Sequence, residues 1–218
     1  MKESLPLLFL FFTAILITVA AVYFKQSPFL VCPLYISLVV GMLQAKANRY
    51  AHLVGSLNSV LYAATFLHLG LYASLCSALL VSFPLQMATF IRWSKNADGS
   101  STKFKQLKPW GWGAMAVIFV ISFIALNAIM EALGSGYVLL DNSHALIGFF
   151  ATLLSLFAFK EYSYLMIGSG TLTVWLYLEM IAQTPAQTTH VIYSVYTLIC
   201  IVRQFFSVRK IYRQQQGE

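Results

Sequence analysis

Charged side chains are scarce in this sequence: Lys, Arg, Asp and Glu make up 10% of its 218 residues. A soluble domain carries roughly a quarter of charged residues, which hydrate its surface. Hydrophobic residues account for 59% of the chain, and the mean hydropathy is +0.75. Because lipid is the solvent that tolerates such a composition, the sequence excludes a soluble domain and predicts an all-α membrane protein.

Motifs of soluble catalysis are also missing. The chain has no GxxxxGK[ST] phosphate loop, no HExxH and no carboxylate pair at helical spacing. The short run 168–170 (GSG) is better explained by close helix packing than by nucleotide binding. Cys32, Cys76 and Cys200 each lie in an apolar run without CxxC spacing. We therefore expect no enzyme activity, no cofactor, no disulfide framework and no metal site.

Eight segments with few or no charged residues follow one another along the chain. Each approaches the ~20 residues that a spanning helix needs, so the sequence predicts eight transmembrane helices. We interpret the first as a retained helix and not a signal peptide, because the charges of Lys2 and Glu3 cancel and its apolar run is long. The expected bounds are 5–24, 28–45, 50–69, 72–92, 110–131, 140–159, 162–182 and 188–208.

The charges are distributed unequally between the two sides of the membrane. With eight crossings, every Lys and Arg except Lys25 falls on the side of the N-terminus. Basic residues in short loops stay in the cytoplasm, so we expect a bacterial cytoplasmic (inner) membrane protein with both termini cytosolic. Glu131, Asp141 and Glu179 fall at outer helix ends and predict an acidic outer mouth. The net charge of +7, including that of the polar stretch 94–108, is expected to meet lipid headgroups and not nucleic acid.

The two halves of the chain share one plan, three helices that include a small-residue patch, at residues 54–56 (VGS) and 167–169 (IGS). One linking helix lets the second unit repeat the orientation of the first, which predicts a 3 + 1 + 3 parallel repeat. Such repeats occur in transporters, with the substrate site between the units near mid-membrane. The expected division is an extra transmembrane helix at 1–27, the first three-helix unit at 28–94, a basic cytoplasmic loop and linker helix at 95–135, the second unit at 136–208 and a cytoplasmic tail at 209–218.

Neutral polar and aromatic residues stand inside the predicted spans, where no Asp, Glu, Lys or Arg except Arg203 is expected. Carriers coupled to protons or sodium usually need such an ionisable group, so a facilitator is favoured over a pump. The polar groups suit an uncharged or cationic substrate, although helix–helix hydrogen bonding remains the alternative. His52, His68, His144 and His190 are interpreted as interfacial or packed residues. The candidate substrate-binding residues are Asn58, Tyr62, Gln86, Tyr164, Ser169, Tyr177 and Tyr193.

Several of these residues fall in short runs, GSLNSVLYA at 55–63, LGLYAS at 69–74 and FPLQ at 83–86, which Trp93 follows. In this order they resemble the nicotinamide riboside transporter (PnuC) family. The second half follows with Leu176-Tyr177 and a last helix opened by Tyr193. The resemblance implies a fold like that of the SWEET sugar transporters, a homotrimer, and facilitated diffusion of a vitamin or nucleoside that a cytosolic kinase traps. Aromatic walls would suit a cationic pyridinium riboside.

The sequence departs from the family pattern at three places. The family's Trp-rich stretch with a substrate-binding Asn is matched by Tyr164 and by Ser169 or Gly170, and the Tyr four residues before Gln86 is Ser82. Nicotinamide riboside is therefore the leading cargo, with thiamine, riboflavin and deoxynucleosides as alternatives. A non-transporting membrane subunit that binds a protein partner through the same polar groups is the second hypothesis.

Overall fold

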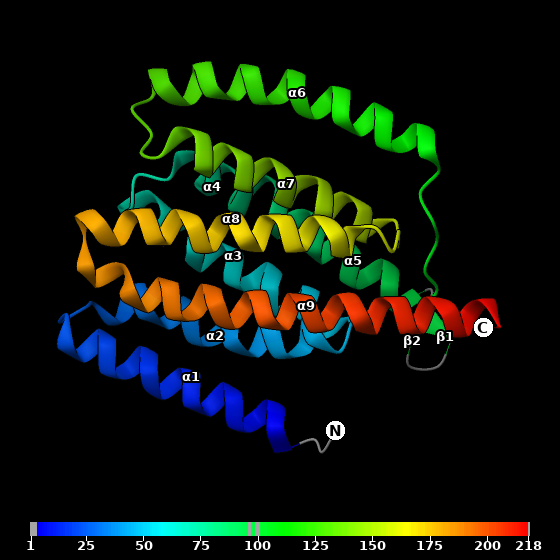
Figure 1. The fold of residues 1–218 in the computed structure, drawn as a ribbon, viewed down its shortest axis with the longest axis horizontal. Helices are drawn as coiled ribbons and strands as arrows, with labels where there is room; N and C mark the ends of the chain where they lie inside the picture. Colours follow the sequence, from blue (N-terminus) through cyan, green and yellow to red (C-terminus); the bar gives the residue numbers. More distant parts are fainter. Residues whose placement is uncertain (1–3, 96, 99–100, 218) are drawn as a thin grey trace.

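The computed structural model describes residues 4–95, 97–98 and 101–217, and its helices lie side by side along one direction (Figure 1). Lys2, Glu3 and Glu218, which entered the charge count, lie outside the described residues. The elements are α1 (Ser4–Tyr23), α2 (Pro28–Ala45), α3 (Tyr50–His68), α4 (Tyr72–Cys76), a π-helical segment (Ser77–Ser82), α5 (Phe83–Lys95), the short strands β1 (Ala97–Asp98) and β2 (Ser101–Thr102), α6 (Pro109–Ala132), α7 (Val138–Leu156), α8 (Tyr162–Gln183), a 3-10 turn (Pro185–Gln187) and α9 (Thr188–Gln216).

Each of the eight expected segments contains a long helix, with α4, the π-helical segment and α5 running on as one. Within the described chain, six helices are long and apolar enough to cross a membrane: α2, α4–α5, α6, α7, α8 and α9. Helix α1 supplies a shorter apolar stretch, Leu7–Tyr23. Helix α3 is long enough, but its polar residues Ser56, Asn58 and Ser59 lower its mean hydropathy. These three residues are buried inside the protein. The prediction of an all-α, multi-pass membrane protein is confirmed.

Six helices form a closed ring. In chain order α2, α3, α5, α7, α8 and α9 each pack against the next, and α9 packs back against α2. Helices α2 and α7 both begin at the same end of the molecule, at the left of Figure 1. Helix α1 packs outside the ring against α9 and α2, and α6 packs outside against α7. The two groups α2–α5 and α7–α9 thus run in the same order and direction around one centre.

A π-helical segment interrupts the helix between α4 and α5. Pro84 has no N–H and its ring clashes with the carbonyl four residues back, which disfavours a regular α-helix just before it. The N–H of Phe83 instead bonds to the carbonyl of Ala78, five residues back. The hydroxyl of Ser56 on α3 donates to the Phe83 carbonyl at 2.8 Å. Such bulges re-aim nearby side chains and are frequent at functional sites.

A buried carboxylate joins the two groups at the end of the molecule where α2 and α7 begin (Figure 1). Asp141, in the first turn of α7, is fully buried. It accepts hydrogen bonds from the backbone N–H of Ala73 at 3.0 Å and of Ser74 at 3.4 Å, and from the Ser74 hydroxyl. These N–H groups belong to the first turn of α4, so α7 caps the neighbouring α4. The expectation that Asp141 contributes to an acidic outer mouth is wrong, because its carboxylate is buried and bonded to the first turn of α4.

At the opposite end, part of the polar stretch 94–108 is bound beneath the ring. Trp93 is buried, and its indole N–H donates to the Ser155 carbonyl at 2.9 Å. Phe104 packs edge-on against Trp93 with ring centroids 5.6 Å apart. The backbone N–H of Lys105 donates to the carbonyl of Ala158 at 2.8 Å. The Phe104 side chain and the backbone of Lys105 are therefore packed against the helices, while the Lys105 side chain is exposed.

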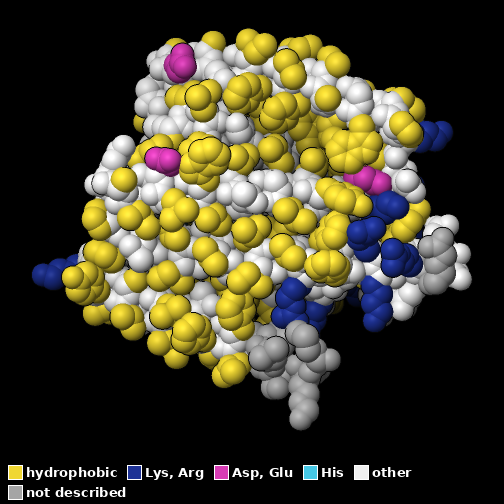
Figure 2. Space-filling model, in the orientation of Figure 1, with side chains coloured by type: hydrophobic (Ala, Val, Ile, Leu, Met, Phe, Trp, Pro, Cys, Tyr) yellow, Lys and Arg dark blue, Asp and Glu magenta, His cyan; other side chains and the backbone are white. Residues whose placement is uncertain are grey.

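The surface divides between apolar sides and a basic end. Figure 2 shows hydrophobic side chains over most of the visible face and Lys and Arg gathered toward its right end, where α9 ends in Figure 1. Large exposed apolar side chains crowd α1 and α6, which suits contact with lipid. Met130 is the one residue of α6 that is buried.

The Asp141 cap gives a stability prediction. Asp141→Asn removes the charge and turns an N–H₂ group toward N–H donors, so we expect it to destabilise the protein by about 1–3 kcal/mol. The check is thermal unfolding of the purified protein in detergent. Glu131→Gln is the control, since Glu131 is an exposed carboxylate at the C-terminal end of α6. Equal melting temperatures for Asp141→Asn and the unaltered protein would contradict the cap.

Candidate substrate cavity

A cavity of about 240 Å³ lies at the centre of the ring. It lies between the two groups, with α2, α3 and α4–α5 forming one side and α7, α8 and α9 the other. Its polar and tyrosine side chains are Ser37 and Gln44 of α2, Asn58, Ser59 and Tyr62 of α3, Ser74, Ser77, Ser82 and Gln86 of α4–α5, His144 and Thr152 of α7, Ser169, Thr173 and Tyr177 of α8, and Tyr193, Ser194 and Thr197 of α9.

Six of the seven candidate binding residues lie at this cavity. Tyr164 does not: its side chain is 41% exposed, and its ring packs edge-on against Phe205 at 5.1 Å. The cavity-facing residues of α8, including Ser169, Thr173 and Tyr177, follow helical spacing. Tyr164 stands five residues before Ser169, which turns it to the opposite face of α8. The six that line the cavity are Asn58, Tyr62, Gln86, Ser169, Tyr177 and Tyr193.

The amide of Asn58 is held in one orientation. Its Nδ2 donates to the Pro33 carbonyl at 3.1 Å and to the Ser37 hydroxyl at 2.7 Å. A carbonyl oxygen can only accept, so the nitrogen must face α2. The Oδ1 atom of Asn58 is then left buried without a hydrogen-bond partner among the described residues. Oδ1 of Asn58 is therefore an unpartnered acceptor on a residue that lines the cavity.

Gln86 lies against a glycine on the neighbouring helix. A Cβ atom on Gly55 would collide with Oε1 of Gln86. The missing side chain of Gly55 thus leaves the space that the Gln86 carboxamide occupies. In the first small-residue patch, Gly55 therefore makes room for the side chain of Gln86. In the second patch, a Cβ on Gly168 would meet nothing closer than Ile147 at 3.9 Å.

An aromatic wall lines the side formed by α3 and α9. Tyr62 stacks on Phe66 with ring centroids 5.3 Å apart and lies 6.1 Å from the ring of Tyr193. The Tyr62 hydroxyl is buried and has no hydrogen-bond partner within the described part of the chain. Thr197 also lines the cavity, and its hydroxyl is likewise buried and unpartnered among the described residues. This wall combines ring faces with buried hydroxyl groups.

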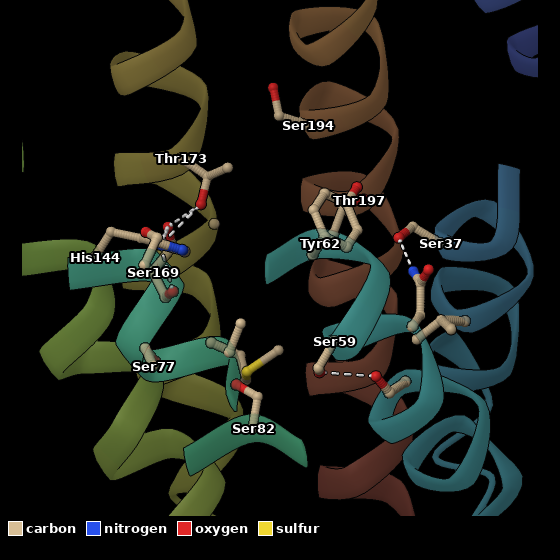
Figure 3. A pocket seen from close by; sticks show the side chains of 18 of the residues that line it. Ser37, Ser59, Tyr62, Ser77, Ser82, His144, Ser169, Thr173, Ser194 and Thr197 are labelled. Carbon is tan, nitrogen blue, oxygen red and sulfur yellow. Dashed lines mark hydrogen bonds between the residues drawn. The ribbon is translucent and has the colours of Figure 1, made fainter. Parts of the chain in front are cut away.

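The opposite wall carries a histidine that the sequence did not single out. His144 of α7 lies with Ser169 and Thr173 of α8 (Figure 3), and its Nδ1 is 3.0 Å from the Ser169 hydroxyl and 2.9 Å from the Thr173 hydroxyl. The interpretation of His144 as an interfacial or packed residue missed its place at the cavity. The available signal was its position one helical turn after Asp141, which puts both on one face of α7.

The cavity walls carry no fixed charge among the described residues: no Lys, Arg, Asp or Glu lines it. Within the same ranges, no group of three His, Cys, Asp or Glu residues could hold a metal ion. Hydrogen-bonding atoms, ring faces and one imidazole are what this site offers. It is therefore suited to bind and release a small polar molecule, and carries no constellation for chemical conversion.

Residues 31–206 match the family whose description reads nicotinamide mononucleotide transporter. Among solved structures, a crystal structure of the vitamin B3 transporter PnuC is similar to this chain, with a TM-score of 0.80 and 20% sequence identity. The similarity covers 96% of this chain and 90% of that one. At this identity the structural likeness shows the fold. No curated protein matches the chain significantly.

The Gly55–Gln86 contact gives a prediction for ligand binding. Gly55→Ala must push the Gln86 carboxamide aside, so we expect about ten-fold weaker apparent affinity for cargo, the value of one lost polar contact. The check is concentration-dependent uptake into liposomes that contain the purified protein. Gly168→Ala is the matched control, because a methyl group has room there. Equal affinities for the two variants would contradict the placement of Gln86.

Proposed function

Because the chain belongs to the nicotinamide mononucleotide transporter family, which is a family of transporters and not of enzymes, we propose that it carries a vitamin B3 compound across the membrane, with nicotinamide riboside as its cargo. The expected kinship with the PnuC family is confirmed by the family match and the common fold. The choice of the riboside over the mononucleotide rests on the chemistry of the cavity.

The neutrality of the cavity is the observation that carries this choice. A mononucleotide bears a phosphate, and binding a phosphate away from water requires Lys, Arg or a similar partner. The described cavity lining has neither. A riboside has hydroxyl and amide groups instead, which match the free acceptor of Asn58 and the carboxamide of Gln86. Its cationic pyridinium ring suits the aromatic wall of Tyr62, Phe66 and Tyr193 through cation–π attraction.

The same chemistry supports facilitated diffusion. Asp141, whose partner Ser74 lines the cavity, is engaged in the cap of α4, and the described lining offers no carboxylate for a coupling ion. A cytosolic kinase would trap the cargo by adding a phosphate that the cavity does not accommodate. The cavity, at about 240 Å³, is slightly smaller than the roughly 300–1,000 Å³ of typical ligand sites, which limits it to one compact molecule of vitamin or nucleoside size.

For the assembly, we propose the 3 + 1 + 3 parallel repeat with units at 28–94 and 136–208, preceded by the extra helix of residues 1–27. The site residues remain Asn58, Tyr62, Gln86, Ser169, Tyr177 and Tyr193. The protein would reside in a bacterial cytoplasmic membrane, as a homotrimer, with both termini cytosolic. The basic end seen in Figure 2 supports this orientation, since positive loops face the cytoplasm.

Uptake of labelled nicotinamide riboside tests the function directly. Liposomes containing the protein should show saturable uptake that unlabelled riboside blocks, whereas protein-free liposomes should not. Nicotinamide mononucleotide should compete at least about 100-fold more weakly, because an unpaired buried phosphate costs several kcal/mol. Competition by thiamine, riboflavin or a deoxynucleoside would assign the transporter another cargo. No transport of any of these would instead favour a partner-binding membrane subunit.

Site variants sharpen the assignment. Gln86→Ala removes a carboxamide from the cavity wall, and we expect its uptake to fall to a tenth or less of the unaltered rate at low substrate concentration. Tyr164→Ala should keep near-normal uptake, because Tyr164 lies on the outer face of α8. Both variants are compared at equal amounts of protein in the membrane. Loss of uptake in Tyr164→Ala with normal uptake in Gln86→Ala would reverse the site assignment.

The orientation is tested with reporter fusions. A fluorescent protein that folds only in the cytosol should be active when it is joined to the C-terminus. A periplasm-dependent phosphatase should be active when it is inserted in the 133–137 turn between α6 and α7. The opposite pattern would invert the proposed topology.

A further inference from the structure

His144 lines the cavity and has no role in the contacts proposed above for the cargo. The residue belongs to the second turn of α7, and all hydrogen bonds of its ring within the described residues involve Nδ1. The partners are the hydroxyls of Ser169 and Thr173, with the Ser169 carbonyl at 3.4 Å. The ring is therefore anchored to α8 through one nitrogen.

The anchor favours a proton on Nδ1. The Thr173 hydroxyl donates to the Ser169 carbonyl at 2.9 Å, so toward His144 the oxygen of Thr173 offers a lone pair. The Ser169 carbonyl can only accept, whereas the Ser169 hydroxyl can accept or donate. Nδ1–H is therefore compatible with all three oxygens, while an unprotonated Nδ1 could accept only from the Ser169 hydroxyl and would face the lone pairs of the other two. With the proton of the neutral ring on Nδ1, Nε2 is an acceptor.

On the basis of the proposed function, we propose that Nε2 of His144 accepts a hydrogen bond from the cargo and makes this residue a determinant of cargo specificity. The donor is a ribose hydroxyl or a carboxamide N–H, the two kinds of donor that a nicotinamide riboside carries. Oδ1 of Asn58, on α3 across the cavity from α7, would be a second acceptor for the cargo. The cavity then selects molecules that bring donors and disfavours those that bring a carboxylate.

Inhibition constants against riboside uptake test this contact. The competitors are nicotinamide riboside, its 2′-deoxy and 3′-deoxy analogues, and nicotinic acid riboside, in which a carboxylate replaces the carboxamide. Loss of the donor that meets His144 should weaken competition about ten-fold in the unaltered protein. In His144→Phe that ratio should fall to near one. The analogue whose ratio collapses identifies the donor as a hydroxyl or the carboxamide.

Two further variants separate contact from structure. His144→Gln can still offer an acceptor to the cavity and should restore part of the lost ratio. His68→Phe makes the same side-chain change at an exposed position at the end of α3 and should leave every ratio unchanged. An equal loss for all competitors in His144→Phe, with no change in their ratios, would overturn the proposal and give His144 a structural role.

The outcomes distinguish the role of His144 from the proposed function. Riboside uptake by the unaltered protein together with unchanged ratios in His144→Phe overturns the role of His144 and leaves the proposed function standing. Absence of riboside uptake by the unaltered protein overturns the proposed function, and the role of His144 with it. Ratios that collapse for one analogue alone, with partial rescue by Gln, support both.

Discussion

A polar side chain inside a bilayer must find its hydrogen-bond partner within the protein, because hydrocarbon offers none. Most hydroxyls here meet that demand within their own helix, as Ser59, Thr89 and Thr152 do by donating to the carbonyl four residues back. Against this background the unpartnered buried atoms stand out. Nine such atoms occur among the described residues, and those of Asn58, Tyr62 and Thr197 belong to residues that line the cavity.

The same demand explains how the two groups are joined at their ends. At the end where α7 begins, Asp141 of the second group accepts hydrogen bonds from the first turn of α4 in the first group. At the opposite end, Trp93 of the first group donates to the Ser155 carbonyl of the second. Between these ends α9 of the second group packs directly against α2 of the first, where the Tyr196 hydroxyl donates to the Leu38 carbonyl at 2.9 Å. Polar contacts between the two groups therefore surround the cavity.

The sequence predicts how many helices there are better than how they face one another. Hydropathy marks a spanning segment by its mean apolarity, so all eight helices were found, including α3 with its buried polar face. The direction in which a side chain points depends on how its helix packs against the neighbouring helices. Tyr164 and Tyr177 are both tyrosines of α8, yet of the two only Tyr177 lines the cavity. Asp141 was misplaced because its partner Ala73 lies 68 residues away, and only the fold brings them together.

If the protein has the proposed function, its uncharged cavity walls bear on the direction of transport. A facilitator moves cargo only down its gradient, so accumulation must come from chemistry after entry. Adding a phosphate converts a riboside that needs donors, acceptors and ring faces into a molecule that needs a cationic partner. Walls that carry neither Lys nor Arg in the described lining cannot supply one. The absence of charge that admits the cargo is thus also what would keep its phosphorylated product inside.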